Sequence, residues 1–562
     1  MKKLIYSVLI VAAAVTSVSA QPWANASLDI NQAKAMVNSN GDLFWDYTNP
    51  GFEVPKGAGT HMISAGALWV GGLDAGGQLR LGAQTYRQSG NDFYPGPIMT
   101  QSSYSAANDV LWNRVWKINR STVDSFRLGL FATIPAVIQD WPGNGNVAMG
   151  QAAQLAAYVD IDGDGVYNPS AGDYPCIKGD QAVFFMFNDG RNVHTETGGA
   201  IMNFEFHAML YGYSAPGTWL DTVVFLNYKM YNRSSITLTN AYIGTFIDFD
   251  IGSYSDDFVG CDVGRSMFYG YNGDANDGTS AFPTTGTYGA NPPAEGVVFL
   301  RGPLATPNDF VDNNRNGTVD EPGEVCLMNN FVYYNNDFTI TGNPVLAQDY
   351  YGYMSGFWKD GTPITYGGNG YGGNQNADFM YPATSDATGW GTGGAILNGN
   401  WSEMTENNTP YDRRAFAGSG PFIMQPGNAM CLDFAFVYGR SFDTIVGSSI
   451  GSIQTVADSA RYFYNQSSPC TCVINPLSVN EASHDLLVEF YPNPASDNVT
   501  VLYHPENGNA TLEIYDMTGK IVATEIISKT STVVDLKKLS PGIYLIRISD
   551  GKSWGTARVL KQ

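Results

Sequence analysis

Three aspartates at alternate positions are the best candidate for chemistry in this chain. Asp160, Asp162 and Asp164 are followed by Gly165 and Val166. Short carboxylates at this spacing converge on one hard cation, because the glycine permits a sharp turn and the next residue offers its carbonyl. We therefore predict a structural calcium loop with the ligands Asp160, Asp162, Asp164, Val166 and Asp173.

This loop departs from the EF-hand pattern. Ala171 stands where the EF-hand has a bidentate glutamate, and Asp173 is the nearest later carboxylate. Pro169 and the Tyr/Val-rich flanks disfavour a helix on either side. The prediction is therefore a calcium loop of another type, and a metal-free Asp/Gly turn is the alternative.

A second segment repeats the spacing with amides in place of two carboxylates, and Glu321 and Glu324 follow it. Fewer charges imply weaker calcium binding. Its predicted ligands are Asp312, Asn314, Asn316, Thr318 and Asp320. A further acidic group at a strand end either completes a calcium site or is solvated: Asp248, Asp250, Asp256 and Asp257.

The sequence has few motifs that indicate catalysis. The chain has five histidines and no HExxH motif, so it lacks the zincin signature. His194 with Glu196 and Asp189 is a weak metal candidate, because this spacing is common by chance. His207 lies in an apolar run and is interpreted as a packed histidine. A glycosidase needs only two carboxylates, and 52 Asp and Glu leave that possibility open.

The stretch from 350 to 394 is rich in Gly, Tyr, Trp and Asn, which predicts an extended loop system. Aromatic rings on such loops offer large, rigid contact areas to a ligand. The predicted ligand contacts are Tyr366, Tyr371, Trp390 and Trp401. The alternative is that these rings fill gaps between sheets.

Strands must position these residues. Period-two apolar runs dominate the body, and the clearest helical stripe covers 449–464. We predict an all-β fold, with a large β-sandwich-like body that has long Gly/Asn/Tyr-rich loops. The absence of a clean internal repeat weakens a propeller or solenoid interpretation.

Composition points to an ordered extracellular protein. Aromatic residues make up 13% and charged residues 15% of the 562 residues, and the net charge is −22. The acidic excess lies in the body, so nucleic-acid binding is not expected. Six cysteines permit three disulfides in an exported protein, with buried free thiols as the alternative: Cys176, Cys261, Cys326, Cys431, Cys470 and Cys472.

The N-terminus has the order of a secretory signal peptide. Lys2 and Lys3 precede an apolar run, and the small residues of a cleavage site follow, the last of them Ala20. The apolar run is shorter than the roughly 20 residues of a spanning helix, and no later segment is apolar enough to span. We predict a signal peptide at 1–20 and no transmembrane segment after cleavage.

The C-terminus predicts a separate seven-stranded Ig-like β-sandwich at 486–562. Alternation places pairs of apolar residues on one face in several strands, namely Val499 with Val501, Leu512 with Ile514, and Ile546 with Ile548. A polar linker at 468–485 joins this module to the body at 21–467, which has one or two subdomains.

The motifs YPNPA at 491–495, IYDMTGK at 514–520 and LSPGIY at 539–544 closely resemble the type A C-terminal sorting domain of type IX secretion cargo in Bacteroidota. The resemblance implies Sec export, recognition of the tail by the outer-membrane translocon, and release or attachment to surface polysaccharide. The strings ALWVGGLDAGG, DIDGDGVYNPSAGDYP and RRAFAGSGPFIMQPG resemble an uncharacterised group of large secreted surface proteins.

These observations favour a secreted or surface-attached, non-enzymatic, calcium-stabilised adhesin or envelope component. Its expected partners are the translocon and either surface polysaccharide or another surface protein. Two alternatives stay open: a secreted glycan-active hydrolase, and a self-assembling surface-layer or filament subunit.

Overall fold

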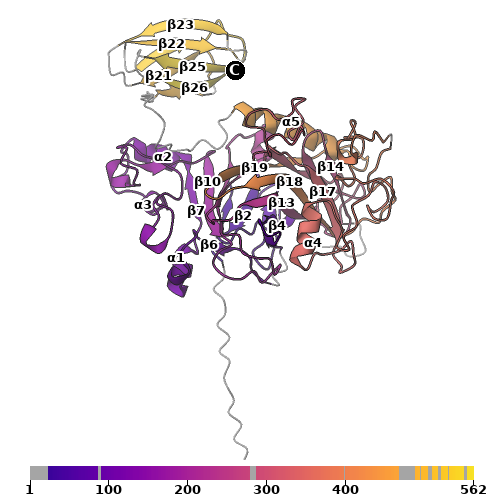
Figure 1. The fold of residues 1–562 in the computed structure, drawn as a ribbon. Coiled ribbons are helices and arrows are strands. Elements are labelled where there is room, and N and C mark those ends of the chain that lie inside the picture. The colour runs from indigo at the N-terminus through magenta and orange to yellow at the C-terminus, as the bar shows by residue number, and fades with distance from the viewer. Residues whose placement is uncertain are drawn as a thin grey trace, which may run out of the picture. The chain divides into compact units, whose positions relative to one another are not determined.

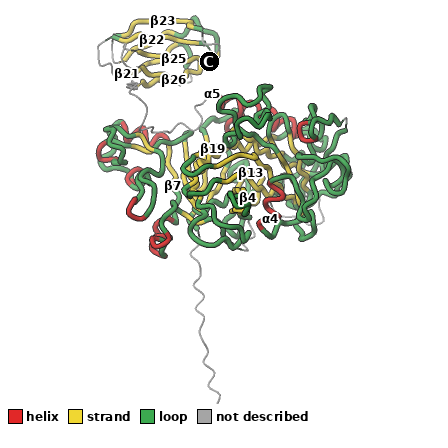
Figure 2. The backbone as a smooth tube through the Cα atoms, viewed as in Figure 1, coloured by secondary structure: helices red, strands yellow, loops and turns green. Residues whose placement is uncertain are grey.

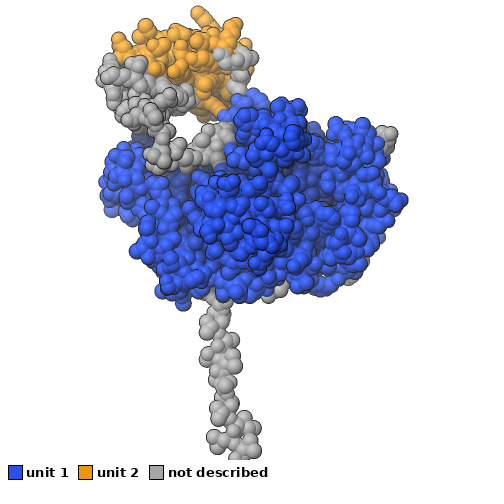
Figure 3. Space-filling view, viewed as in Figure 1, with its two compact units in different colours: residues 1–474 blue, residues 475–562 orange. Residues whose placement is uncertain are grey.

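The computed structural model describes residues 23–85, 90–278, 286–397, 399–466, 488–493, 495–503, 509–516, 520–528, 531–549 and 554–562. The chain divides into two compact units, 1–474 and 475–562, which Figure 3 shows in blue and orange. The predicted signal peptide and linker lie outside the described residues.

The larger unit, here called the body, contains two extended antiparallel sheets (Figure 1). The first has eight strands in the order β1-β2-β3-β4-β13-β18-β17, with β5 paired to β4. Its strands are β1 (Asn25–Leu28), β2 (Lys34–Asn38), β3 (Phe52–Glu53), β4 (His61–Leu73), β5 (Leu79–Ala83), β13 (Leu238–Phe249), β17 (Asn330–Asn335) and β18 (Arg413–Met424).

The second sheet has nine strands in the order β14-β15-β16-β19-β12-β11-β10-β6, with β7 paired to β10. Its strands are β6 (Tyr94–Pro95), β7 (Trp116–Asn119), β10 (Gln181–Asn188), β11 (Phe204–Gly212), β12 (Val224–Asn232), β14 (Asp257–Asp262), β15 (Met267–Asn272), β16 (Ala294–Arg301) and β19 (Ala429–Gly439). A two-stranded ribbon, β8 (Tyr158–Val159) with β9 (Tyr174–Pro175), lies outside both sheets.

The nine-stranded sheet is apolar on both faces. On β11, Phe204 and Phe206 belong to a core shared with the eight-stranded sheet, while Met209 and Tyr211 belong to a second core on the opposite face. Successive side chains of a strand point to opposite faces, so this alternation makes the sheet the middle layer of the body. The face that carries the second core is called the outer face below.

Helices and loops cover the sheets, and Figure 2 shows how short and peripheral the helices are. They are α1 (Ala106–Trp112), α2 (Arg120–Arg127), α3 (Ala136–Gln139), α4 (Ala347–Met354) and α5 (Ser449–Gln466). α4 packs against β4, β5, β13 and β18 of the eight-stranded sheet. The stripe predicted at 449–464 is confirmed in α5, which packs on β16 and β19 and buries Ile453, Ala457, Ala460 and Tyr464.

The C-terminal unit is a small two-sheet sandwich, as predicted. Its described residues form seven strands: β20 (Val488–Tyr491), β21 (Asn498–Tyr503), β22 (Ala510–Tyr515), β23 (Ile521–Ile527), β24 (Ser531–Asp535), β25 (Gly542–Ser549) and β26 (Trp554–Lys561). Sheets β20-β21-β24 and β23-β22-β25-β26 enclose a separate core. That core contains the apolar pairs predicted from alternation: Val499, Val501, Leu512, Ile514, Ile546 and Ile548.

The structure bears on two predictions about the body, which concern disulfides and membrane-spanning helices. Cys261 and Cys326 are buried free thiols, so the expectation of three disulfides is wrong for these two residues. Disulfide formation by Cys176 and Cys431 stays a prediction. Throughout the described residues, the helices are too short or too polar to cross a membrane.

Candidate functional sites

The predicted calcium loop brings its three aspartates together. Oxygens of Asp160, Asp162 and Asp164 all lie within 4.8 Å of one another. The carboxylate of Asp160 accepts hydrogen bonds from the amides of Gly163 (2.7 Å) and Gly165 (2.8 Å), and Gly165 has the positive φ that this turn requires. The donor set of hard carboxylate oxygens fits calcium.

Asp173 does not join the cluster of three aspartates and instead binds backbone amides on either side of the loop. It is fully buried, and its two carboxylate oxygens accept hydrogen bonds from the amides of Ile161 and Asn168, both at 2.8 Å. Val166 lies at the exposed end of the loop, where its amide donates to Asp164 at 2.7 Å.

The second predicted loop has the same backbone turn but different side-chain bonding. The amide of Gly317 donates to Asp312 Oδ2 at 2.8 Å, which matches Gly165 and Asp160 in the first loop. The side-chain amides of Asn314 and Asn316 donate to Glu321 Oε1, both at 2.6 Å. The amide of Thr318 donates to Asn316, and Asp320 accepts from the amides of Asp309 and Phe310.

The acidic group at the end of β13 contains a cation from the chain itself. Oxygens of Asp248, Asp250 and Asp412 lie within 4.8 Å of one another. Arg414 Nη2 lies 3.5 Å from Asp248 and 3.3 Å from Asp412. Burial and the charge of Asp412 raise the pKa of Asp250 to about 7. Asp256 and Asp257 accept hydrogen bonds from the amides of Gly278 and Ile251.

The four aromatic residues of the loop system do not share one surface. Trp401 is 1% exposed and packs against Tyr366 and Tyr381, with ring centroids 4.7 and 5.4 Å away. Trp390 is partly buried beneath Arg315. Tyr371 is the exposed member, and its hydroxyl donates to Asp360 at 2.8 Å. Ligand contact by these residues stays a prediction.

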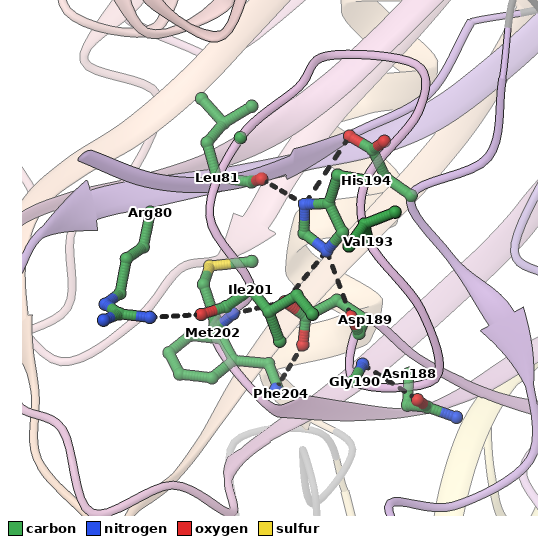
Figure 4. A network of polar contacts seen from close by, with 12 residues as sticks. Arg80, Leu81, Asn188, Asp189, Gly190, Val193, His194, Ile201, Met202 and Phe204 are labelled. Atoms are coloured by element: carbon green, nitrogen blue, oxygen red, sulfur yellow. Dashed lines mark hydrogen bonds and ion pairs between the residues drawn. The ribbon is translucent and has the colours of Figure 1, made fainter. Parts of the chain in front are cut away.

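The polar network around His194 is a buried ion group (Figure 4). Its Nδ1 lies 2.6 Å from the carbonyl oxygen of Leu81, and its Nε2 lies 3.0 Å from the carbonyl oxygen of Asp189. Burial alone would lower the pKa of His194, but the hydrogen bond and charge of Asp189, together with Asp92, raise it to about 9. Both ring nitrogens therefore face protein acceptors, which does not suit the metal-ligand interpretation of His194.

A pocket of about 220 Å³ lies on the outer face of the nine-stranded sheet. The register explains its floor, because directly opposed residues in antiparallel strands point to the same side. His207 of β11 faces Lys229 of β12, and Met209 faces Asn227. The lining residues are Gln154, Leu155, Ala156, Ala157, Tyr158, Cys176, Lys178, Phe184, His207, Ala208, Met209, Asn227, Lys229, Tyr231 and Arg233. We call it the basic pocket.

Cations gather around one aromatic ring at one end of the basic pocket. Lys229 Nζ lies 5.3 Å and Arg233 Cζ 4.3 Å from the centroid of the Tyr231 ring. Burial and the charge of Arg233 lower the pKa of Lys229. A bound anion would stabilise this charged pair, because it would offset both the burial and the mutual repulsion.

Glu205 contacts two residues that line this end of the pocket, Arg233 and His207. Its Oε1 lies 2.7 Å from Arg233 Nη2 and 3.0 Å from His207 Nε2, while its Oε2 accepts the amide of Ile98 at 2.8 Å. Burial alone would raise the pKa of Glu205, but His207 and Arg233 lower it to about 2. The carboxylate is therefore charged and engaged, and it orients Arg233 along the pocket.

A third cation, Lys178, lines the pocket at another point. Its Nζ lies 5.7 Å from the centroid of the Tyr211 ring. Burial lowers the pKa of Lys178, although the nearby charge of Asp433 opposes this effect. Among the described lining residues there are three cationic side chains and no carboxylate.

Sequence reasoning missed the basic pocket. The signal was present in β12, where Asn227, Lys229, Tyr231 and Arg233 occupy alternate positions without an acidic residue between them. In a chain with 30 Lys and Arg against 52 Asp and Glu, that local basic alternation is unusual. The partner histidine on β11 was interpreted only as a packed residue.

Comparisons with known proteins identify the C-terminal unit but not the body. Residues 489–562 match the family model described as the secretion system C-terminal sorting domain. No curated protein sequence matches the chain. Among solved structures, a polysaccharide lyase aligns with 64% of this chain at 9% identity and a TM-score of 0.18, and the chain spans about a third of that protein, 34%. The C-terminal unit is thus a sorting domain, and the protein is a type IX secretion cargo delivered to the cell surface or the extracellular space.

Proposed function

We propose that the protein is an extracellular binding protein of the cell envelope, which binds an acidic polysaccharide in the basic pocket. The observation that carries the proposal is the gathering of Lys178, Lys229 and Arg233 in one pocket of a chain with net charge −22. Export to the cell surface would bring this pocket to surface or environmental glycans.

The acidic surface does not prevent such binding. At physiological ionic strength the screening length is about 8 Å, so distant carboxylates contribute little at the pocket. Three cations line the pocket, while Glu205 is not among the lining residues and is engaged by Arg233 and His207. The apolar wall of Leu155, Ala157 and Met209 lowers the dielectric around the cations.

A direct test compares acidic and neutral polysaccharides by calorimetry with the full chain. Lys229→Gln should weaken binding of polygalacturonate about tenfold, because one charge-assisted contact is lost. Lys34→Gln makes the same charge change at an exposed position of β2 and should leave affinity unchanged. Tight binding of neutral glycans, or equal effects of the two variants, would contradict the proposal. Release of new chain ends would favour the hydrolase alternative instead.

Calcium binding is proposed as a structural accompaniment of this function. The three carboxylates that converge at Asp160, Asp162 and Asp164 support it. We expect the second loop to bind calcium more weakly or not at all. The side-chain amides of Asn314 and Asn316 already donate hydrogen bonds to Glu321.

A further inference from the structure

We infer that the ligand of the basic pocket is a linear polyanion that lies along β12 and presents anionic groups to two separate cationic positions. This inference rests on the proposed function and narrows its ligand class to saccharide chains with repeated carboxylates. Its basis is the spacing of the cations on the sheet.

The first cationic position contains Lys229 and Arg233, on either side of Tyr231 along the chain. Both charges lie against the Tyr231 ring, at 5.3 and 4.3 Å. We expect one anionic group beside this ring to contact both charges. Glu205 holds Arg233 from the side of the sheet, through Nη2 at 2.7 Å.

The second cationic position is Lys178, beside Tyr211 of β11. The backbone amide of Lys178 donates to Met209 Sδ at 3.4 Å, and Met209 pairs with Asn227 of β12, two residues before Lys229. Tyr211 pairs with Phe225, four residues before Lys229. A strand rises about 3.3 Å per residue, so the second position lies roughly 7 to 13 Å from Lys229 along β12. Anionic groups on successive units of a chain would reach both positions.

The two lysines differ in their local compensation. Lys229 Nζ contacts the Tyr231 ring, and the charge that acts on it is that of Arg233. Lys178 Nζ contacts the Tyr211 ring and feels the charge of Asp433, whose two oxygens already accept hydrogen bonds from Asn227 and Tyr464. Burial disfavours both ammonium groups, and a ligand with two anionic groups would offset this cost at both positions.

The surface between the two positions suits a sugar ring. Asn227 and Met209 face one another there, and Leu155 and Ala156 line the wall. This combination of an apolar wall with an amide matches a ring that has an apolar face and hydroxyl edges. A carboxylated saccharide chain therefore fits better than a nucleic acid, whose dense phosphates the acidic body repels over its length.

The test is a length series of oligogalacturonates, from monomer to hexamer, titrated into the full chain by calorimetry. Affinity should rise about tenfold or more once the oligomer reaches both positions, and then level off. Lys178→Gln should remove that gain with length. Lys229→Gln should weaken every length, and Lys34→Gln should weaken none.

The outcomes separate this inference from the proposed function. Equal affinity for monomer and hexamer, with a measurable monomer affinity, would overturn the linear-polyanion inference and leave the proposed anion binding intact. Absence of binding to every acidic saccharide, sulfated ones included, would overturn both. A single-stranded oligonucleotide of matched charge should bind at least tenfold more weakly, and equal binding would overturn the assignment to saccharides.

Discussion

At the scale of single residues, His194 is the clearest case of a side chain whose charge is set by its surroundings. It is buried between β5 and the loop after β10, where carbonyl oxygens of Leu81 and Asp189 face its two ring nitrogens. Asp92 lies 3.9 Å from Nδ1 and carries the charge that complements the ring from the other side. The imidazolium therefore joins the segment 81–92 to the segment 189–194.

This arrangement predicts a stability that falls with alkaline pH. The folded-state pKa of His194 is about 9, above its ordinary value of 6.5. A raised pKa contributes stability that is fully present below 6.5 and is lost as the pH rises through 9. His194→Gln should lower the free energy of unfolding by about 3 kcal/mol at pH 6, because it removes the cation that neutralises the buried Asp189 and Asp92.

Denaturant titrations of both proteins at several pH values check this prediction. The difference between wild type and His194→Gln should shrink between pH 7 and pH 10. His61→Gln is the control, because burial lowers rather than raises the pKa of His61. A constant difference across the pH range would show that His194 contributes packing rather than charge.

At the scale of elements, the sequence pattern of the two Asp/Asn/Gly loops predicted their backbone turn but not their side-chain bonding. The shared spacing predicted the shared turn, and the structure has the same bond from glycine to the first aspartate in both. The pattern did not reveal that Glu321 reaches back to Asn314 and Asn316, because its position depends on how the chain folds after the turn. Side chains that complete a loop from outside the motif are invisible to spacing alone.

That difference predicts that calcium acts through the first loop. Calcium should raise the melting temperature by several degrees, because the ion offsets repulsion among three converging carboxylates and binds only the folded state. Asp162→Asn should remove most of this gain. Asp312→Asn, the same change of carboxylate to amide in the second loop, should remove little of it. Scanning calorimetry with calcium and with chelator measures both, and an unchanged melting temperature would exclude a calcium role.

At the scale of the whole molecule, strand periodicity was enough to predict the sandwich but not the pocket. Alternation identifies which residues share a face of one strand, as it did for Val499 and Val501. The basic pocket depends on which segments become neighbours, because residues 154–158 form its wall against β11 and β12, which come much later in the chain, at 204–212 and 224–232. It also depends on Lys178, whose side chain reaches the outer face from a loop before β10.

The division of the molecule into two units predicts that export by the C-terminal unit and binding by the body are separable. The C-terminal unit has its own core, and no residue of that core belongs to either core of the body. A chain that ends at 474 should therefore keep the melting temperature of the body and the affinity of the basic pocket. In cells it should remain in the periplasm, because the sorting domain at 489–562 is missing. Fractionation, calorimetry and the binding titration test these points together. Loss of affinity in a truncated chain that still melts cooperatively would mean that the C-terminal unit contributes to the site.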